Sequence, residues 1–193
     1  MPKLGMEPIR RAAIVKATID EIGLAGSLDV TVSQIAKRAG VSAALAHHYF
    51  GGKDDMFLAA MRHILTLYGA AVRAALAGAG TPRARLEAVI RASFQTEQFR
   101  GHVVSAWLNF YVAAQTSPHA QRLLRVYQRR LRSNLVHDLR PLVGGRAGAV
   151  ADTLAALIDG LYIRAALGPG LADPEASAAR VLAMLDLLIG EVT

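Results

Sequence analysis

The sequence contains no cysteine. This absence excludes disulfides, thiolate zinc sites, iron–sulfur clusters and cysteine nucleophiles, and it is typical of a reducing compartment. No early segment combines the charged and apolar regions of a signal peptide, and charges interrupt every apolar stretch before the roughly 18 residues that a membrane helix needs. We therefore expect a soluble, cytoplasmic protein that is held together by packing alone.

Strand patterns are also missing, because no alternating run rich in valine, isoleucine and threonine lies between turn residues. Almost every segment instead has helical periodicity, and glycines and prolines mark where helices begin and end. We expect an all-α protein of about nine helices. The expected ranges are 8–24, 32–39, 43–50, 53 to near Gly78, 83–99, 102–115, 118–143, 147–167 and 174–191.

Motifs for catalysis are scarce as well. The sequence has no His-x-x-x-His pair with a supporting glutamate and no phosphate-binding glycine loop. His47 and His48 occupy adjacent helix positions that point in different directions, so they form a poor chelate. Arg125, Arg129 and Arg130 are typical of a solvated helix face. We therefore expect no enzyme activity, no cofactor and no metal site.

The net charge of +7 and a pI near 10.2 favour a polyanionic partner, with nucleic acid before an anionic membrane. Residues 1–64 carry 8 basic and 6 acidic groups, however, whereas residues 65–193 carry 14 and 9. The charge therefore does not locate a DNA-binding region, and the case for one must come from residue pattern.

The pattern that indicates DNA binding is TVSQIAKRAGVSAALAHHYF, residues 31–50. Thr31 and Gln34 form the signature of a capping box, which starts a short helix that stops at Gly40. Ser42 is placed to cap a second helix after a tight turn. This arrangement is a helix-turn-helix, and an ordinary αα-hairpin is the alternative.

The second helix of this motif would present small side chains outward, which lets its backbone approach base edges in the major groove. The predicted outward residues are Ser42, Ala43, Ala44 and His47.

The segment resembles the TetR family over more than the hairpin. The matching residues are Ile14, Ala17, Ile35, Ala36, the stretch 39–42, Phe50 and Lys53. The resemblance implies a three-helix DNA-binding domain, a connecting fourth helix, and a helical body that binds a ligand and dimerises through its last two helices. We accordingly expect a helix-turn-helix domain over 1–52 and a ligand-binding and dimerisation domain over 53–193, with operator DNA, a small-molecule effector and a second copy of the chain as partners.

Many family members end the recognition helix with tyrosine, any residue, histidine and phenylalanine, whereas here the four positions are His47, His48, Tyr49 and Phe50. This ending, together with residues 1–11 and 156–167, resembles the choline-responsive repressors of glycine betaine synthesis. That narrower resemblance implies a repressor of choline-to-glycine betaine genes that a choline-type ligand releases from DNA.

Within the motif, the resemblance extends the predicted DNA contacts to His48, Tyr49, Lys53, Thr31 and Ser33. Tyr49 and Lys53 are assigned to phosphates, which position a protein without reading sequence, and Thr31 and Ser33 are further phosphate candidates. The alternatives are partial burial or solvation for the two histidines, a purely structural cap for Thr31 and an exposed hydroxyl for Ser33.

The last two expected helices are apolar over more than one face, so each needs cover on two sides. A second subunit supplies the missing cover in a symmetric four-helix interface. The alternative is that both helices lie at the centre of a monomer core.

Trp107, Phe110 and Tyr111 share one face of an expected helix, where they form either core or a binding site. The resemblance favours a site, because choline and betaine aldehyde carry a quaternary ammonium that aromatic faces hold best. Trp107, Tyr111 and Tyr162 are the predicted cage. Asp159 either adds a carboxylate for the cation or bridges to an arginine such as Arg164. A bulky apolar effector is the alternative ligand.

Overall fold

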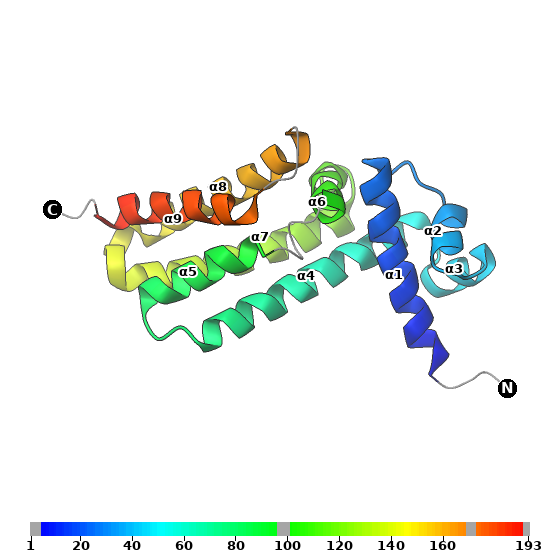
Figure 1. Ribbon diagram of the computed structural model, residues 1–193, viewed down its shortest axis with the longest axis horizontal. Coiled ribbons are helices and arrows are strands. Elements are labelled where there is room, and N and C mark those ends of the chain that lie inside the picture. Colours follow the sequence, from blue (N-terminus) through cyan, green and yellow to red (C-terminus); the bar gives the residue numbers. More distant parts are fainter. Residues whose placement is uncertain (1–4, 96–100, 169–172, 191–193) are drawn as a thin grey trace.

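The computed structural model describes residues 5–95, 101–168 and 173–190, and within them it contains helices and no strand. The all-α prediction is therefore confirmed. The helices are α1 (Met6–Ala25), α2 (Val32–Arg38), α3 (Ala43–Phe50), α4 (Lys53–Ala77), α5 (Pro82–Ser93), α6 (Gly101–Ala113), α7 (Pro118–Val143), the 3-10 turn η1 (Gly144–Arg146), α8 (Ala147–Leu167) and α9 (Pro174–Gly190) (Figure 1).

Most helix ends lie within two residues of the expected ones, and the fifth helix is the exception. It was predicted to reach residue 99, but α5 ends at Ser93, because Phe94 leaves helical geometry and donates its N–H to the Arg91 carbonyl. Residues 96–99, which the prediction also placed in this helix, lie outside the described residues.

The first three helices form a small unit at one end of the molecule, far from the C-terminal helix (Figure 1). Ile14, Ile35 and Ala46 are completely buried where α1, α2 and α3 meet. Gly40 joins α2 to α3 at a φ of 68°, a left-handed conformation in which a side chain would be strained. Burial of apolar side chains from all three helices thus fixes the direction of α3.

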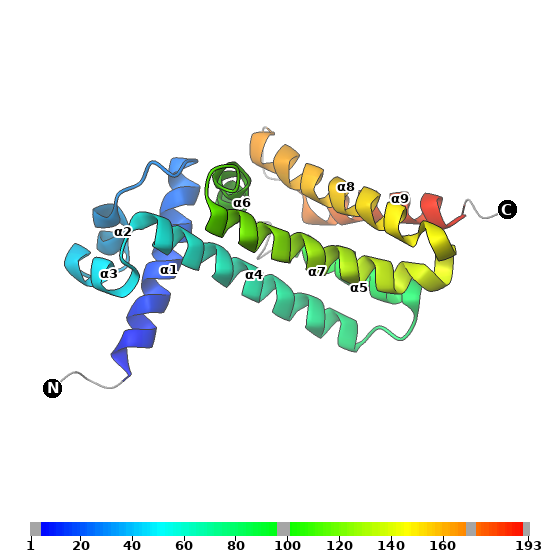
Figure 2. The same ribbon diagram turned by 180° about the vertical axis from the view of Figure 1, so that it is seen from behind.

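Helix α4 extends from this unit to the opposite end of the molecule, where a loop leads back into α5 (Figure 2). Its apolar face packs into the core, because Phe57, Met61, Ile64 and Val72 are all buried. Beyond it, α7 packs against both α5 and α8, and α9 packs against α5 and α8. The body is therefore a stack of long helices with α8 and α9 along one side.

The stretch 118–165 includes a window with a mean hydropathy of 1.2, long and apolar enough by composition to cross a membrane. Charged residues still interrupt this stretch, as expected, because Arg146, Asp152 and Asp159 lie within its most apolar part. Its hydropathy comes mainly from α8, which follows the charged α7 after the break at η1. Helix α8 packs against α6, α7 and α9, so its inner face belongs to the core of the body.

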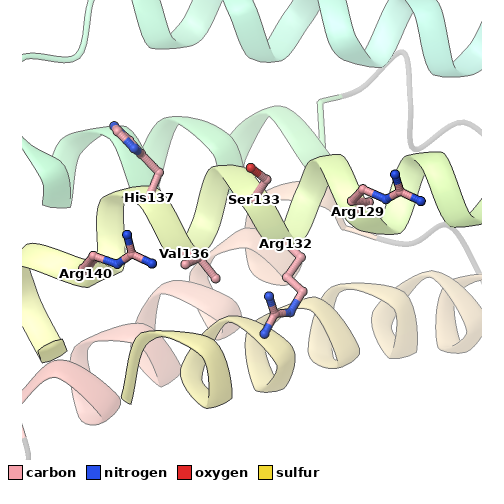
Figure 3. Close-up of a pocket in the computed structure, with 6 residues that line it drawn as sticks. All are labelled: Arg129, Arg132, Ser133, Val136, His137 and Arg140. Carbon is pink, nitrogen blue, oxygen red and sulfur yellow. The ribbon is translucent and has the colours of Figure 1, made fainter. Parts of the chain in front are cut away.

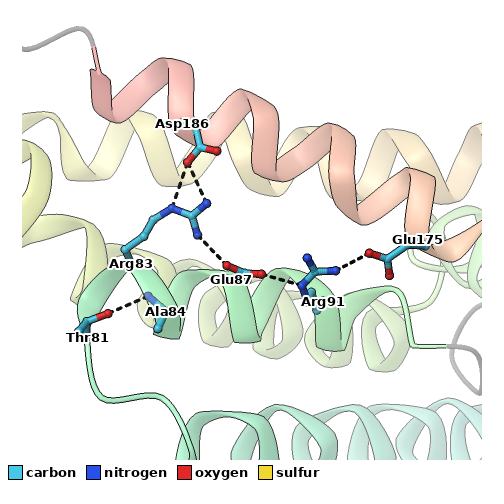
Figure 4. Close-up of polar contacts among 7 residues, drawn as sticks. All are labelled: Thr81, Arg83, Ala84, Glu87, Arg91, Glu175 and Asp186. Atoms are coloured by element: carbon cyan, nitrogen blue, oxygen red, sulfur yellow. Dashed lines mark hydrogen bonds and ion pairs between the residues drawn. The ribbon is translucent and has the colours of Figure 1, made fainter.

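A chain of alternating charges fastens α9 to α5 (Figure 4). Arg83 binds Asp186 at 2.8 Å and Glu87 at 3.3 Å, and Arg91 joins Glu87 at 2.8 Å to Glu175 at 2.5 Å. Hydrogen bonding from Arg91 lowers the pKa of the Glu87 carboxyl. All these groups are partly or largely exposed, so the chain orients α9 more than it stabilises the fold.

Helices α1 and α6 cross in very close contact. A Cβ atom added to Gly23 would lie 2.0 Å from the Cβ of His102 and 2.4 Å from its Cα. Beside this crossing, the Asn109 side-chain amide donates to the carbonyl of Gly26 at 3.3 Å. Glycine is thus required at position 23 by the approach of another backbone, which connects the small N-terminal unit to the body.

Replacing Gly23 with alanine should lower the melting temperature, because the added methyl overlaps atoms that no rotamer change can move. Overpacking of this kind lowers the free energy of unfolding by about 1–3 kcal/mol. For a chain of this size, each kcal/mol lowers the melting temperature by about 2–4 °C. Gly69→Ala is the matched control, because its Cβ would meet only the end of the Arg73 side chain at 3.4 Å, an ordinary contact. An equal change in the two variants in a thermal melt would contradict the proposed tight crossing.

Candidate functional site

The outer face of α3 carries the residues predicted to face DNA. Ser42, Ala44 and His47 are exposed and Ala43 is partly exposed, whereas Ala46 between them is completely buried. The Ser42 hydroxyl accepts a hydrogen bond from the Leu45 N–H at 3.1 Å, so it caps the helix as expected. The structure thus presents a short helix with small side chains on its free face.

The predicted capping box at the start of α2 is present. The Thr31 hydroxyl accepts from the Gln34 N–H at 3.2 Å and donates to the Gln34 side-chain oxygen at 2.8 Å. The cap that the sequence left open as an alternative is therefore real, and it uses the only hydrogen that the Thr31 hydroxyl can donate. Ser33, the other candidate on this helix, is exposed.

The last turn of α3 holds the two histidines and Tyr49. The Nδ1 atom of His47 lies 2.6 Å from the Gly51 carbonyl oxygen, so this ring closes the end of the helix while remaining exposed. His48 is exposed, and its ring lies 5.6 Å from the half-buried ring of Tyr49. Their contact with DNA stays a prediction.

Lys53, the predicted phosphate contact at the start of α4, is half-buried, and its ammonium donates to the Leu28 carbonyl at 3.0 Å. This bond ties α4 to the loop before α2. An ammonium has three donors, so a phosphate contact remains compatible with the structural bond.

Arg11 is a candidate that the sequence pattern did not reveal. Its guanidinium carbon lies 4.7 Å from the centre of the Phe50 ring and 5.6 Å from that of Tyr49. Stacking on aromatic faces holds this cation at the end of the recognition helix. No local pattern could indicate this contact, because Arg11 lies far from the motif along the chain.

The second group of predicted residues gathers between α6 and α8. The ring of Trp107 lies 5.9 Å from Tyr111 and 6.2 Å from Tyr162. Tyr127, contributed by α7, lies nearer still, at 4.8 Å from Trp107. We call Trp107, Tyr111, Tyr127, Tyr162 and Asp159 the aromatic cluster.

Asp159 is the acidic member of the cluster. Its Oδ1 atom accepts hydrogen bonds from the hydroxyls of Tyr111 at 3.0 Å and Tyr127 at 3.3 Å. In the part of the chain that the structure describes, it forms no ion pair, so the alternative of a bridge to Arg164 is not what is observed there. A carboxylate that lies among aromatic rings, as Asp159 does, favours the binding of a cation.

Burial raises the pKa of the Asp159 carboxyl, although the hydrogen bonds from Tyr111 and Tyr127 oppose this shift. Burial also raises the pKa of Tyr111, Tyr127 and Tyr162, and it raises that of the neighbouring Tyr68 to about 12. The hydroxyls therefore stay protonated near neutral pH and act as donors.

Phe110 belongs to the core, which was one of the two alternatives for its helix face, rather than to the aromatic cluster. Phe110 is completely buried and packs edge-on against Phe57 and Trp107, so it supports the tryptophan from the core. Tyr127 lies in the cluster although the prediction omitted it. Its helix is more than ten residues away from Trp107 in sequence, and spacing within one helix could not find it.

Arg125, Arg129 and Arg130, which the sequence pattern indicates as a solvated face of α7, are all exposed. Arg129, Arg132 and Arg140 lie along a shallow cavity of about 310 Å³ but spread along the helix without converging (Figure 3). Arg132 binds Asp152 of α8 at 2.7 Å. These residues therefore do not form an anion site.

Comparison with known proteins matches both parts of the chain. Residues 14–60 match the family described as bacterial regulatory proteins, tetR family, and residues 82–190 match the BetI-type transcriptional repressor C-terminal family. The HTH-type transcriptional regulator BetI of Brucella suis is 53% identical over 94% of this chain and 92% of its own length. The BetI regulator of Agrobacterium fabrum is 52% identical over 86% and 82%.

Solved structures share the fold. A putative transcriptional regulator from Pseudomonas aeruginosa has a TM-score of 0.82 at 28% identity, covering 98% of this chain and 94% of that one. A putative regulator from Saccharomonospora viridis, solved in complex with choline, has a TM-score of 0.82 at 23% identity, covering 93% and 97%. The matches identify a DNA-binding transcriptional repressor and no enzyme. The chain belongs to the TetR family, with a C-terminal domain of the BetI repressor type.

Proposed function

We propose that a quaternary ammonium compound of the choline type binds in the aromatic cluster and releases this repressor from its operator. The observation that carries the proposal is the position of Asp159 among Trp107 and three tyrosines. A quaternary ammonium cannot donate hydrogen bonds, so ring faces and a nearby carboxylate are the groups that hold it.

The hydrogen bonds of Asp159 support this assignment. Both tyrosines donate to the same oxygen, Oδ1, and the second oxygen accepts no hydrogen bond from a described residue. Burial disfavours the negative charge of Asp159, so a cation bound beside it would stabilise that charge. The BetI name of the relatives agrees with a choline-type ligand, whereas the choline-bound neighbour, at 23% identity, shares the fold alone.

Residues 1–52 are assigned to operator binding and residues 53–193 to ligand sensing and dimerisation. The exposed face of α3, with Ser42, Ala43, Ala44, His47 and His48, is placed against base edges. Tyr49 and Lys53, with Ser33 at α2, are assigned to phosphates, and Arg11 joins them. Thr31 would join them only by giving up its hydroxyl bond to Gln34. The repressor so described works on DNA in the bacterial cytoplasm.

A second subunit is assigned to the outer faces of α8 and α9. Ile163 is 40% exposed, Leu167 71% and Leu187 64%, and these apolar side chains lie on the same pair of helices. The inner side chains of the pair, including Leu154 and Leu185, are completely buried within one chain. A symmetric interface would cover the outer side chains, and it explains the excess apolar character of α8.

Replacing Ala44 with glutamate should abolish specific operator binding, because a carboxylate would face the negative potential of the groove. The measurement is the affinity for a palindromic duplex selected from random DNA with the wild-type protein. Ala74→Glu is the control, since Ala74 is exposed on α4 and the change of charge is the same. Normal binding by Ala44→Glu would mean that another helix reads the DNA.

Replacing Trp107 with leucine should weaken choline binding by about tenfold, on the order of 1–2 kcal/mol, because the ring quadrupole is lost. Asp159→Asn should also weaken choline binding while leaving the acceptor for both tyrosine hydroxyls in place. Titration calorimetry with choline and with its uncharged isostere 3,3-dimethylbutan-1-ol measures both effects. Equal binding of choline and the isostere to the wild type would rule out a cation site and favour an apolar effector.

Replacing Leu187 with aspartate should yield a folded monomer, since an unpaired carboxylate buried at a subunit interface costs several kcal/mol. Leu187 is preferable to the buried Leu185, whose replacement would unfold the chain itself. Leu24→Asp is the control, because Leu24 is 72% exposed on α1. Light scattering gives the mass of each, and a dimeric Leu187→Asp would place the interface elsewhere.

A further inference from the structure

A second candidate ligand site lies between α4 and α7, apart from the proposed choline site. The groove has a volume of about 520 Å³, within the range of about 300–1,000 Å³ that small-molecule sites occupy. Much of its lining is apolar, contributed by Leu65, Val72 and Leu76 of α4 and by Leu123, Val126 and Leu131 of α7.

The charges along this groove have one sign. Arg62 and Arg73 of α4 and Arg130 of α7 line it, and no acidic residue is among the lining residues. All three arginines are exposed, and none forms an ion pair with another described residue. In contrast, Arg83 and Arg85 of α5 are paired with acids. The groove therefore offers three available guanidinium groups beside an apolar surface.

The two helices run in the same direction, as both views show (Figure 1, Figure 2). The rings of Tyr68 and Tyr127 meet at 5.8 Å and set their alignment. Arg73 comes after Tyr68 in α4, and Arg130 comes after Tyr127 in α7. Both cations therefore lie on the C-terminal side of the tyrosine pair, toward the same end of the groove. The α7 residues from Leu123 to Asn134 span about 16 Å at about 1.5 Å per residue, so the groove is elongated.

We propose that this groove binds a small amphipathic organic anion, with an aliphatic carboxylate as the simplest example. The anionic head lies between Arg73 and Arg130, where guanidinium groups bind carboxylates through charge-assisted hydrogen bonds. The aliphatic chain lies along α4 and α7 toward Leu65 and Leu123. The site takes the opposite charge from the aromatic cluster, and the proposal stands whether or not choline is the effector.

Tyr127 connects the two sites. It lines the groove, its ring lies 4.8 Å from Trp107, and its hydroxyl donates to Asp159. Trp107 is the only tryptophan in the sequence. A ligand in the groove therefore changes the surroundings of the single tryptophan through one intervening ring, which gives a fluorescence signal for binding.

The experiment titrates full-length protein with decanoate and with decan-1-ol, below micelle-forming concentrations, by tryptophan fluorescence and calorimetry. Decanoate should bind saturably and at least about tenfold more tightly than the alcohol, because only the carboxylate engages the arginines. Absence of saturable decanoate binding up to about 1 mM, or equal binding of the alcohol, would overturn the proposal.

The double variant Arg73→Gln and Arg130→Gln should bind decanoate at least about tenfold more weakly and the alcohol unchanged. The matched control is Arg122→Gln with Arg125→Gln, which removes two exposed arginines of α7 that do not line the groove. Val126→Phe, which fills the groove without changing charge, should weaken both ligands. Equal loss of decanoate binding in the control pair would overturn the site, because the effect would then come from net charge.

Discussion

The close crossing of α1 and α6 is the constraint on which the rest of the arrangement depends. Gly23 lies against the backbone of His102, and the Asn109 amide bonds the carbonyl at the end of α1. Helix α1 in turn packs on α2 and α4, so the direction of the recognition helix follows the position of α6. The same helix carries Trp107 toward α8. One rigid element thus contacts both the operator-binding unit and the aromatic cluster.

This arrangement limits how an effector can act. A ligand changes operator affinity only by binding two arrangements of the chain unequally, and couplings of this kind are typically about 1–3 kcal/mol. Because no side chain separates α1 from α6 at Gly23, a displacement of α6 is transmitted to α1 without slack. In the proposed dimer, a ligand-induced shift at Trp107 would therefore reach α1 and change the spacing of the two recognition helices.

Local features of the sequence predicted most of the fold, whereas contacts between distant segments escaped it. The capping box of Thr31, the glycine at 40 and the prolines at 82 and 118 fixed helix ends because each acts within one turn. The pairing of Arg11 with Phe50, and of Tyr127 with Trp107, depends on tertiary packing that no spacing encodes. The family resemblance predicted Trp107, Tyr111 and Tyr162 as the cage, and the structure adds the ring of Tyr127 beside them.

The bond at the end of α3 also decides what His47 can recognise. A carbonyl oxygen only accepts, so Nδ1 of His47 must carry the hydrogen toward Gly51. In the neutral ring this fixes the tautomer and leaves Nε2 as a lone-pair acceptor. Against the major groove, such an atom matches the exocyclic amino groups of adenine and cytosine rather than the acceptor pair of guanine. In the proposed complex with DNA, this bond would therefore favour adenine or cytosine opposite His47.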